Sequence, residues 1–146
     1  MRVIRLARGA RLAFGSDELH PPTRAELAAW QRDAALAPLA AELAAQWPAL
    51  THNLHRLSFD DGRVRLHLAF GDVACWVPEW VAGVDAFFLD GFAPARNPQM
   101  WDPRLFKAIA RLARPGATAT TWSAAHSVRD GLQAAGFTVN KAPGQG

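Results

Sequence analysis

The chain has 146 residues, 50% of them hydrophobic and 20% charged, which is typical of one globular domain with a single core. Its net charge is +3 and its pI is about 10.0, which favours an anionic partner only weakly. No apolar stretch reaches the roughly 18 residues of a membrane-spanning helix, and Cys75, the only cysteine, excludes an intrachain disulfide. We therefore expect a reducing, cytoplasmic location, with Cys75 in the core.

The first third of the chain predicts a short strand and two helices. Residues 11–14 are expected to form the strand, after an arginine-rich segment, residues 1–11. Thr23 followed by Glu26 is a capping-box pattern and predicts the start of the first helix. A second helix is expected to end before Pro48, with one apolar face made by Leu39, Leu43 and Trp47.

A hairpin follows, and then strands alternate with helices. The hairpin is predicted from two alternating segments, residues 54–59 and 64–70, around the turn Asp60-Asp61-Gly62. The short apolar run Val84–Leu89 predicts a buried strand, and Asp102-Pro103 predicts a helix start. Further elements are expected as a short helix near Trp76 and Trp80, a strand over 117–122, a helix over 125–135 and a last strand over 137–140. This order predicts an α/β fold with a mostly parallel sheet.

Acidic residues near predicted strand ends are the candidates for chemistry. They are Glu18, Asp72 and Asp90, and the carboxyl ends of parallel strands are where open α/β sheets bind ligands. Carboxylates there accept hydrogen bonds from ribose hydroxyls or from an adenine amino group, so they indicate a nucleoside-type site. The five histidines have no metal-ligand spacing, and the sequence has neither a G-x-S-x-G elbow nor a phosphate-binding P-loop.

One long segment carries a family resemblance. The string L-D-G-F-A-P-A-R-N-P-Q-M-W, residues 89–101, is similar to the methyltransferase domain of the bacterial bifunctional enzyme that makes 5-methylaminomethyl-2-thiouridine in tRNA. The segments D-E-L-H-P-P-T-R-A-E-L and H-R-L-S-F-D-D-G-R-V-R-L-H-L-A-F-G-D-V also resemble that domain, as does the segment from Ala110 to Val139. The resemblance spans roughly Leu12 to Lys141.

The resemblance implies a class I, Rossmann-like methyltransferase fold that uses S-adenosylmethionine as methyl donor. The implied reaction methylates the primary amine of 5-aminomethyl-2-thiouridine at the wobble position of tRNA. In the complete bifunctional enzymes, a flavin-dependent oxidoreductase domain with FAD first exposes that amine. The implied partners are therefore tRNA and the oxidoreductase domain, with no metal and no membrane.

The resemblance also assigns roles to residues. Glu18 is expected to bind the cofactor's ribose, Asp72 to lie near its adenine, and Asp90 to lie beside both the methyl group and the incoming amine. A carboxylate at Asp90 would hydrogen-bond the amine and stabilise charge developing on its nitrogen. The acceptor pocket is expected to include Phe92, Pro94, Asn97 and Trp101, with Phe92 and Trp101 either stacking on a flipped-out base or packing the loop on the sheet.

The family's first strand and its glycine-rich cofactor loop correspond to sequence before Leu12, and residues 1–9 are too short and arginine-rich to supply them. We therefore expect one partial domain over residues 1–146, lacking the first and last strands of the sheet. Loss of the central strand is expected to leave its two neighbours unpaired and to weaken S-adenosylmethionine binding. Completion by another chain would preserve the methyltransferase. Two alternatives remain open: an inactive fragment, or an RNA-binding remnant that uses a basic helix face of Arg104, Lys107, Arg111 and Arg114.

Overall fold

The structure, a computed structural model, describes residues 12–16, 23–30, 33–91 and 93–140. The chain divides into two compact units, Met1–Asp17 with Asp72–Gly146, and Glu18–Gly71. No described helix is long and apolar enough to cross a membrane. The first unit contains β1 (Leu12–Ser16), α3 (Val73–Trp76), η2 (Val77–Glu79), β4 (Val84–Asp90), η3 (Pro98–Trp101), α4 (Pro103–Leu112), β5 (Ala113–Thr121) and α5 (His126–Ala134).

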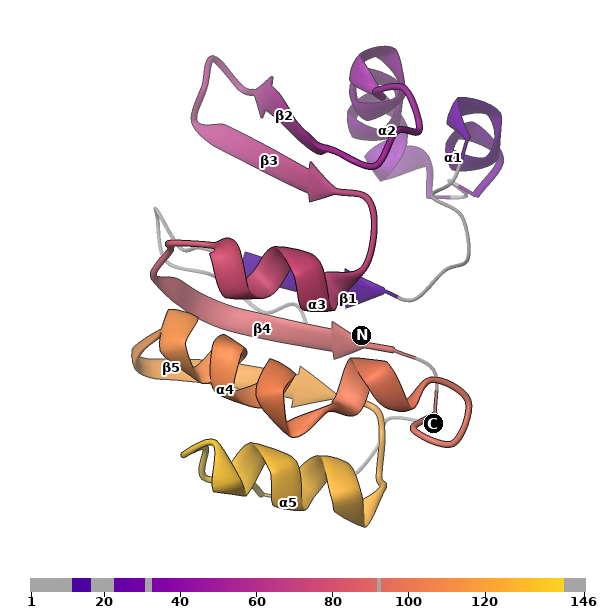
Figure 1. Cartoon of the computed structure of the whole chain (residues 1–146). Coiled ribbons are helices and arrows are strands. Elements are labelled where there is room, and N and C mark those ends of the chain that lie inside the picture. The colour runs from indigo at the N-terminus through magenta and orange to yellow at the C-terminus, as the bar shows by residue number, and fades with distance from the viewer. Residues whose placement is uncertain (1–11, 17–22, 31–32, 92, 141–146) are drawn as a thin grey trace. The chain divides into compact units, whose positions relative to one another are not determined.

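The sheet of the first unit has the order β1-β4-β5, and both pairings are parallel (Figure 1). This confirms the α/β fold with a parallel sheet. One expectation is wrong. Two strands were expected to lack a partner because the central strand is absent, but β1 and β4 pair with each other. Leu12 lies opposite Ala86 and Ser16 opposite Asp90, so β1 pairs directly with β4 along all five of its residues. The backbone groups of β1 on that side are thereby satisfied within the sheet.

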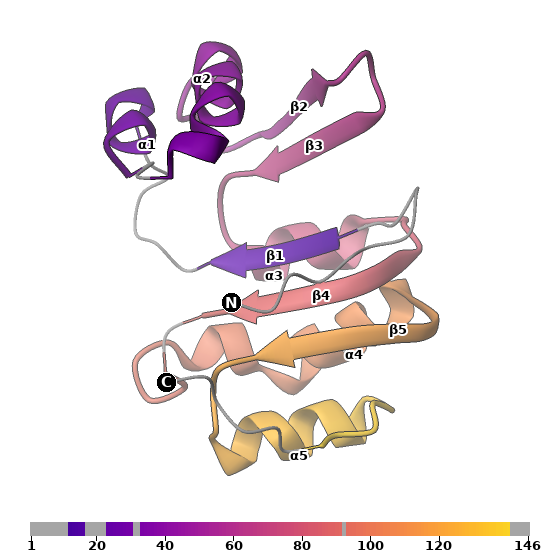
Figure 2. The same ribbon diagram turned by 180° about the vertical axis from the view of Figure 1, so that it is seen from behind.

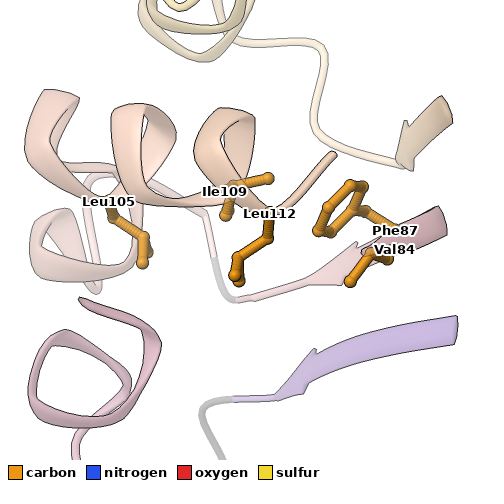
Figure 3. Packing of buried hydrophobic residues seen from close by; sticks show 5 residues of the cluster. All are labelled: Val84, Phe87, Leu105, Ile109 and Leu112. Atoms are coloured by element: carbon orange, nitrogen blue, oxygen red, sulfur yellow. The ribbon is translucent and has the colours of Figure 1, made fainter. Parts of the chain in front are cut away.

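A cluster of apolar side chains attaches α4 to β4. The helix begins as predicted, because Asp102 Oδ1 accepts a hydrogen bond from the Arg104 N–H at 2.7 Å and Pro103 takes the first helical position. Its predicted stripe, Leu105, Ile109 and Leu112, is buried against Val84 and Phe87 of β4 (Figure 3). Both α3 and α4 lie on the same face of the sheet (Figures 1 and 2). The apolar cluster between α4 and β4 holds β4 in place up to its carboxyl end.

An arginine ties the end of α4 to the segment before β4. The Arg111 guanidinium donates to the carbonyl oxygens of Trp80 at 2.9 Å, Val77 at 3.1 Å and Pro78 at 2.9 Å. The fork of donors on one guanidinium can bind several carbonyl oxygens at once, and Val77 also accepts the Trp80 backbone N–H at 3.3 Å. The Arg111 side chain therefore links α4 to η2 by hydrogen bonds.

A second apolar cluster joins α5 to α4. Phe106 of α4 and Val128 of α5 are each 1% exposed, and Leu132 packs beside them. Gly131 allows this approach: a Cβ atom there would lie against Phe106 Cε2 and 2.5 Å from Phe106 Cδ2. Glycine inside a helix costs about 1 kcal/mol relative to alanine. The close approach of the Phe106 ring explains why this helix nevertheless has glycine at position 131.

We therefore predict that Gly131→Ala destabilises the protein, although alanine is the better helix former. The added methyl group would overlap the Phe106 ring and force α5 away from α4, at a cost of about 1–3 kcal/mol. Urea unfolding measures the loss. The exposed Gln133→Ala on the same helix is the control and should stay within about 0.5 kcal/mol of the parent. Equal stability of Gly131→Ala and the parent would contradict the close contact.

The second unit holds α1 (Arg24–Trp30), η1 (Ala34–Leu36), α2 (Ala37–Gln46), β2 (Leu54–Phe59) and β3 (Val64–Ala69). The two strands form the predicted antiparallel hairpin, in which Phe59 lies opposite Val64. Its turn uses three successive residues in the left-handed region: Asp60 at φ 54°, Asp61 at φ 51° and Gly62 at φ 81°. Asparagine, aspartate and glycine tolerate that region best, which explains the D-D-G sequence.

The predicted capping box is present at the start of α1. The Thr23 backbone N–H and hydroxyl donate to Glu26 Oε2 at 2.7 and 2.8 Å, while the Glu26 N–H lies 3.3 Å from Thr23 Oγ1. These bonds favour the ionised carboxylate. They therefore lower the pKa of Glu26, with the backbone N–H of Thr23 as the larger cause and its hydroxyl as the smaller.

We predict that α1 loses protection in acid because of this cap. A carboxyl group with a lowered pKa in the folded state stabilises the fold above its ordinary pKa, and this contribution disappears as pH falls through the lowered value. Amide hydrogen exchange of α1 between about pH 6 and about pH 3 measures it. Glu26→Gln should flatten the pH dependence, whereas Glu42→Gln on α2 should not. An unchanged profile in Glu26→Gln would contradict the cap.

Three further sequence predictions are wrong. Residues 137–140 form no strand; Phe137 and Val139 instead pack as irregular chain against the two clusters. Leu39, expected on an apolar helix face, is 62% exposed. Leu43 and Trp47 of the same predicted face are half-buried, whereas the first turn of α2, which holds Leu39, is not covered. Cys75, expected in the core, is exposed on the short helix α3.

Candidate functional site at the carboxyl end of the sheet

Asp90 is the last residue of β4, and its side chain is exposed at the carboxyl end of the sheet. Its Oδ1 atom accepts a hydrogen bond from the Trp122 indole N–H at 2.9 Å. Within the described part of the chain, Oδ2 has no hydrogen-bond partner. A carboxylate with one oxygen fixed and the other open presents a single acceptor in a defined direction.

Trp122 is a site residue that the sequence analysis missed. It directly follows β5, and because Leu89 lies opposite Thr121 in the parallel register, Trp122 comes next to Asp90. The side chain is 64% exposed, which is unusual for so large an apolar group. The signal was available in the sequence: an aromatic residue immediately after a strand that pairs with the Asp90 strand.

We predict that the Asp90–Trp122 hydrogen bond is visible in solution. The protein has six tryptophans and therefore six indole N–H resonances, of which Trp122→Phe identifies one by its disappearance. Asp90→Ala should shift that resonance alone, because only its hydrogen-bond acceptor is removed. Asp130→Ala on α5, also an exposed aspartate, is the control. A Trp122 resonance that ignores Asp90→Ala would show that the bond does not form.

Asp72 caps the short helix α3. Its Oδ1 atom accepts a hydrogen bond from the Ala74 N–H at 2.8 Å, and the side chain is exposed. The next residue, Val73, lines the same small cavity as Leu89 and Gly91, so Asp72 belongs to the edge at which β4 ends. The cap uses one carboxylate oxygen and leaves the other for a ligand.

The loop after β4 begins with a buried glycine. A Cβ atom on Gly91 would lie 3.2 Å from Trp101 Cζ2 and 3.4 Å from Met100 Cε, so the chain passes close over these side chains. A tight turn follows, in which the Asn97 N–H donates to the Ala93 carbonyl oxygen at 3.2 Å. Both Pro94 and Asn97 are half-buried. The loop thus keeps two of the predicted acceptor-pocket residues at the protein surface.

Trp101 has a different position from the one that base stacking requires. It is 7% exposed and packs on Phe106 with a ring-centroid distance of 6.4 Å. Packing of the loop on the sheet, one of the two expected roles, is what its surroundings support. The exposed aromatic ring at this edge is that of Trp122. Two other predicted site residues, Glu18 and Phe92, lie outside the described residues.

The residues present suit an adenosyl group in their chemistry. Open carboxylate oxygens on Asp72 and Asp90 match the hydroxyl and amino donors of a nucleoside. The cavity beside them is about 30 Å³ and apolar, room for water but not for an adenine ring. A nucleoside would therefore lie along the open edge, over the carboxylates and Trp122, rather than in that cavity.

The predicted basic face of α4 is partly occupied by internal contacts. Arg111 forms the carbonyl clamp described above. Arg114, predicted on the helix, lies instead in β5, because α4 ends at Leu112, and it pairs with Asp85 at 3.4 Å. Arg104 and Lys107 remain exposed. The four residues therefore do not form one free cationic surface, and half of the set has a structural role.

Comparisons with known proteins identify a matching family and similar sequences. Residues 34–146 match a family of S-adenosyl-L-methionine-dependent methyltransferases. The chain is 58% identical to the tRNA 5-methylaminomethyl-2-thiouridine biosynthesis bifunctional protein MnmC of Methylibium petroleiphilum, covering 93% of this chain and 21% of the relative. Proteins of the same name are 55% identical in Cupriavidus necator (92% and 21%) and 52% identical in Azoarcus sp. (95% and 22%). The chain thus spans about a fifth of the length of these relatives.

Proposed function

The chain belongs to this family of S-adenosyl-L-methionine-dependent methyltransferases, and we propose that it methylates the primary amine of 5-aminomethyl-2-thiouridine at the wobble position of tRNA. The observation that carries the proposal is Asp90, an exposed carboxylate at the end of β4 with Oδ1 bound to Trp122 and Oδ2 open. The tRNA substrate is inferred from the name of the relatives. The location that follows is the cytoplasm.

In this proposal the cofactor lies along the carboxyl edge. Asp72 accepts a hydrogen bond from the adenine amino group, Glu18 binds the ribose hydroxyls, and Asp90 lies near the reacting end. When bound, S-adenosylmethionine supplies an electrophilic methyl group on a sulfonium. The protein's task is to orient the two reactants, since positioning accounts for a large part of the acceleration in such transfers.

The amine must reach the methyl group as the neutral base, because an ammonium ion has no lone pair. Asp90 Oδ2 accepts one N–H of the amine and directs the lone pair away from the carboxylate. Transfer of the methyl group would place positive charge on the amine nitrogen, and the Asp90 carboxylate would stabilise that charge. The extra proton then leaves to water. Phe92, Pro94 and Asn97 form the wall of the acceptor pocket, and Trp122 is the ring available for stacking.

The amine itself requires an earlier reaction. The relatives are named bifunctional, and we propose that a flavin-dependent oxidoreductase domain, in the same protein or in a partner chain, exposes it. FAD belongs to that domain.

The decisive experiment compares Asp90→Asn with the parent in methyl transfer to tRNA bearing 5-aminomethyl-2-thiouridine. Loss of a charge that stabilises the transition state lowers turnover by about 10²–10³-fold. S-adenosylmethionine affinity, measured by calorimetry, should be little changed. Asp130→Asn, which removes an exposed carboxylate on α5, is the matched control and should keep full turnover. Full turnover by Asp90→Asn would remove Asp90 from the mechanism.

A second candidate, a chain without cofactor binding, is favoured by the direct pairing of β1 with β4. In the family resemblance, a further strand and its glycine-rich loop come between these two strands. Calorimetry on the folded chain separates the candidates. Binding of S-adenosylmethionine supports the methyltransferase, whereas a folded chain that binds none is an inactive fragment or an RNA-binding remnant.

A further inference from the structure

The β2–β3 hairpin has two chemically different faces. The pairing places Arg56 opposite His67 and Ser58 opposite Arg65, and because strand residues alternate, these four side chains share one face. All four are exposed. The other face carries the half-buried apolar side chains of Leu57, Phe59, Leu66 and Leu68. The four polar residues Arg56, Ser58, Arg65 and His67 are called the hairpin cationic face.

The charges of this face are not neutralised within the described part of the protein. There, neither the Arg56 nor the Arg65 guanidinium forms an ion pair or a hydrogen bond. The hairpin has two carboxylates, Asp60 and Asp61, and both lie in the turn. Asp60 is already bonded to Arg63. Two guanidinium groups are therefore available to an anionic ligand.

The face is also hollowed. A depression of about 150 Å³ is lined by Arg56, Leu57, Ser58, Arg65 and His67. Arg56 and Arg65 are diagonal neighbours across the two strands, a relation that separates their backbones by roughly 7–8 Å. Two forked donors at that spacing, with a hydroxyl and an imidazole between them, can hold adjacent anionic groups.

We propose that the hairpin cationic face binds the sugar–phosphate backbone of tRNA. The inference rests on the proposed function for the identity of the RNA, and it adds a contact surface made of hairpin residues that have no role in the candidate site. Guanidinium groups bind phosphate oxygens in a bidentate manner. The face has no Phe, Tyr or Trp ring for stacking on bases, so we expect it to contribute affinity and orientation rather than sequence selectivity.

The test measures binding of unmodified tRNA to the full chain by fluorescence anisotropy, from about 50 to about 200 mM salt. Arg56→Gln/Arg65→Gln should weaken binding about tenfold or more at low salt. It should also make the slope of log affinity against log salt shallower by roughly 1.4–1.8, since each phosphate contact contributes about 0.7–0.9. Arg104→Gln/Lys107→Gln on α4 removes the same charge from another exposed surface and should change both quantities much less.

A folding defect is separated by a second variant and a second readout. Arg56→Lys/Arg65→Lys keeps the charge and should keep most of the salt slope while losing affinity with the bidentate geometry. In the parent, tRNA should shift the backbone resonances of residues 54–58 and 65–69. The inference is overturned if the two glutamine pairs lose affinity equally, if the hairpin resonances do not respond, or if the chain binds no tRNA.

Failure of this inference and failure of the proposed function give different results. S-adenosylmethionine binding, measured by calorimetry, should be the same in the parent and in Arg56→Gln/Arg65→Gln. A chain that binds tRNA through the hairpin but binds no cofactor refutes the methyltransferase and keeps the RNA contact. A chain that binds the cofactor, and whose tRNA affinity is unchanged by the hairpin substitutions, refutes the RNA contact and keeps the methyltransferase.

Discussion

The packing of α4 on β4 is the interaction on which the rest of the first unit depends. The buried apolar residues of known exposure lie between Val84 and Leu132, and one cluster of them joins the α4 stripe to Val84 and Phe87 of β4. Burying such side chains contributes about 1.5–3 kcal/mol each, more than any exposed ion pair of this chain can offer. Asp90 lies further along the same strand, at its carboxyl end. The packed cluster therefore fixes the position of the Asp90 backbone, as a hydrogen-bond acceptor of defined geometry requires.

Local sequence rules predicted the elements whose cause is local. The Thr23–Glu26 cap, the D-D-G hairpin and the Asp102-Pro103 helix start each depend on residues a few positions apart, and all three are present. The failures concern tertiary context. Residues 137–140 alternate like a strand but pack as irregular chain, and the expectation that β1 would lack a partner overlooked β4. Pairing between distant segments is not encoded in any short window of sequence.

The candidate site was predicted in its carboxylates but not in its aromatic ring. Asp90 could be located because a carboxylate after a buried apolar run marks the end of a parallel strand. Two tryptophans near it, Trp101 and Trp122, look alike in sequence, yet one is 7% exposed and the other 64%. Only the register of β4 against β5 separates them. Arg111 is a similar case, since a helical spacing cannot tell a solvated arginine from one that binds three carbonyl groups.

The order of strands in the sheet also has a kinetic consequence. Only a loop, η3 and α4 separate β4 from β5 in the sequence, whereas the whole Glu18–Gly71 unit lies between β1 and β4. Closing the longer loop costs more chain entropy, so the β4-α4-β5 segment is the natural nucleus and β1 docks last. This last strand pairs with β4 over only five residues. In native-state hydrogen exchange, β1 should therefore open at lower free energy than the rest of the sheet, making it the point from which the fold first comes apart.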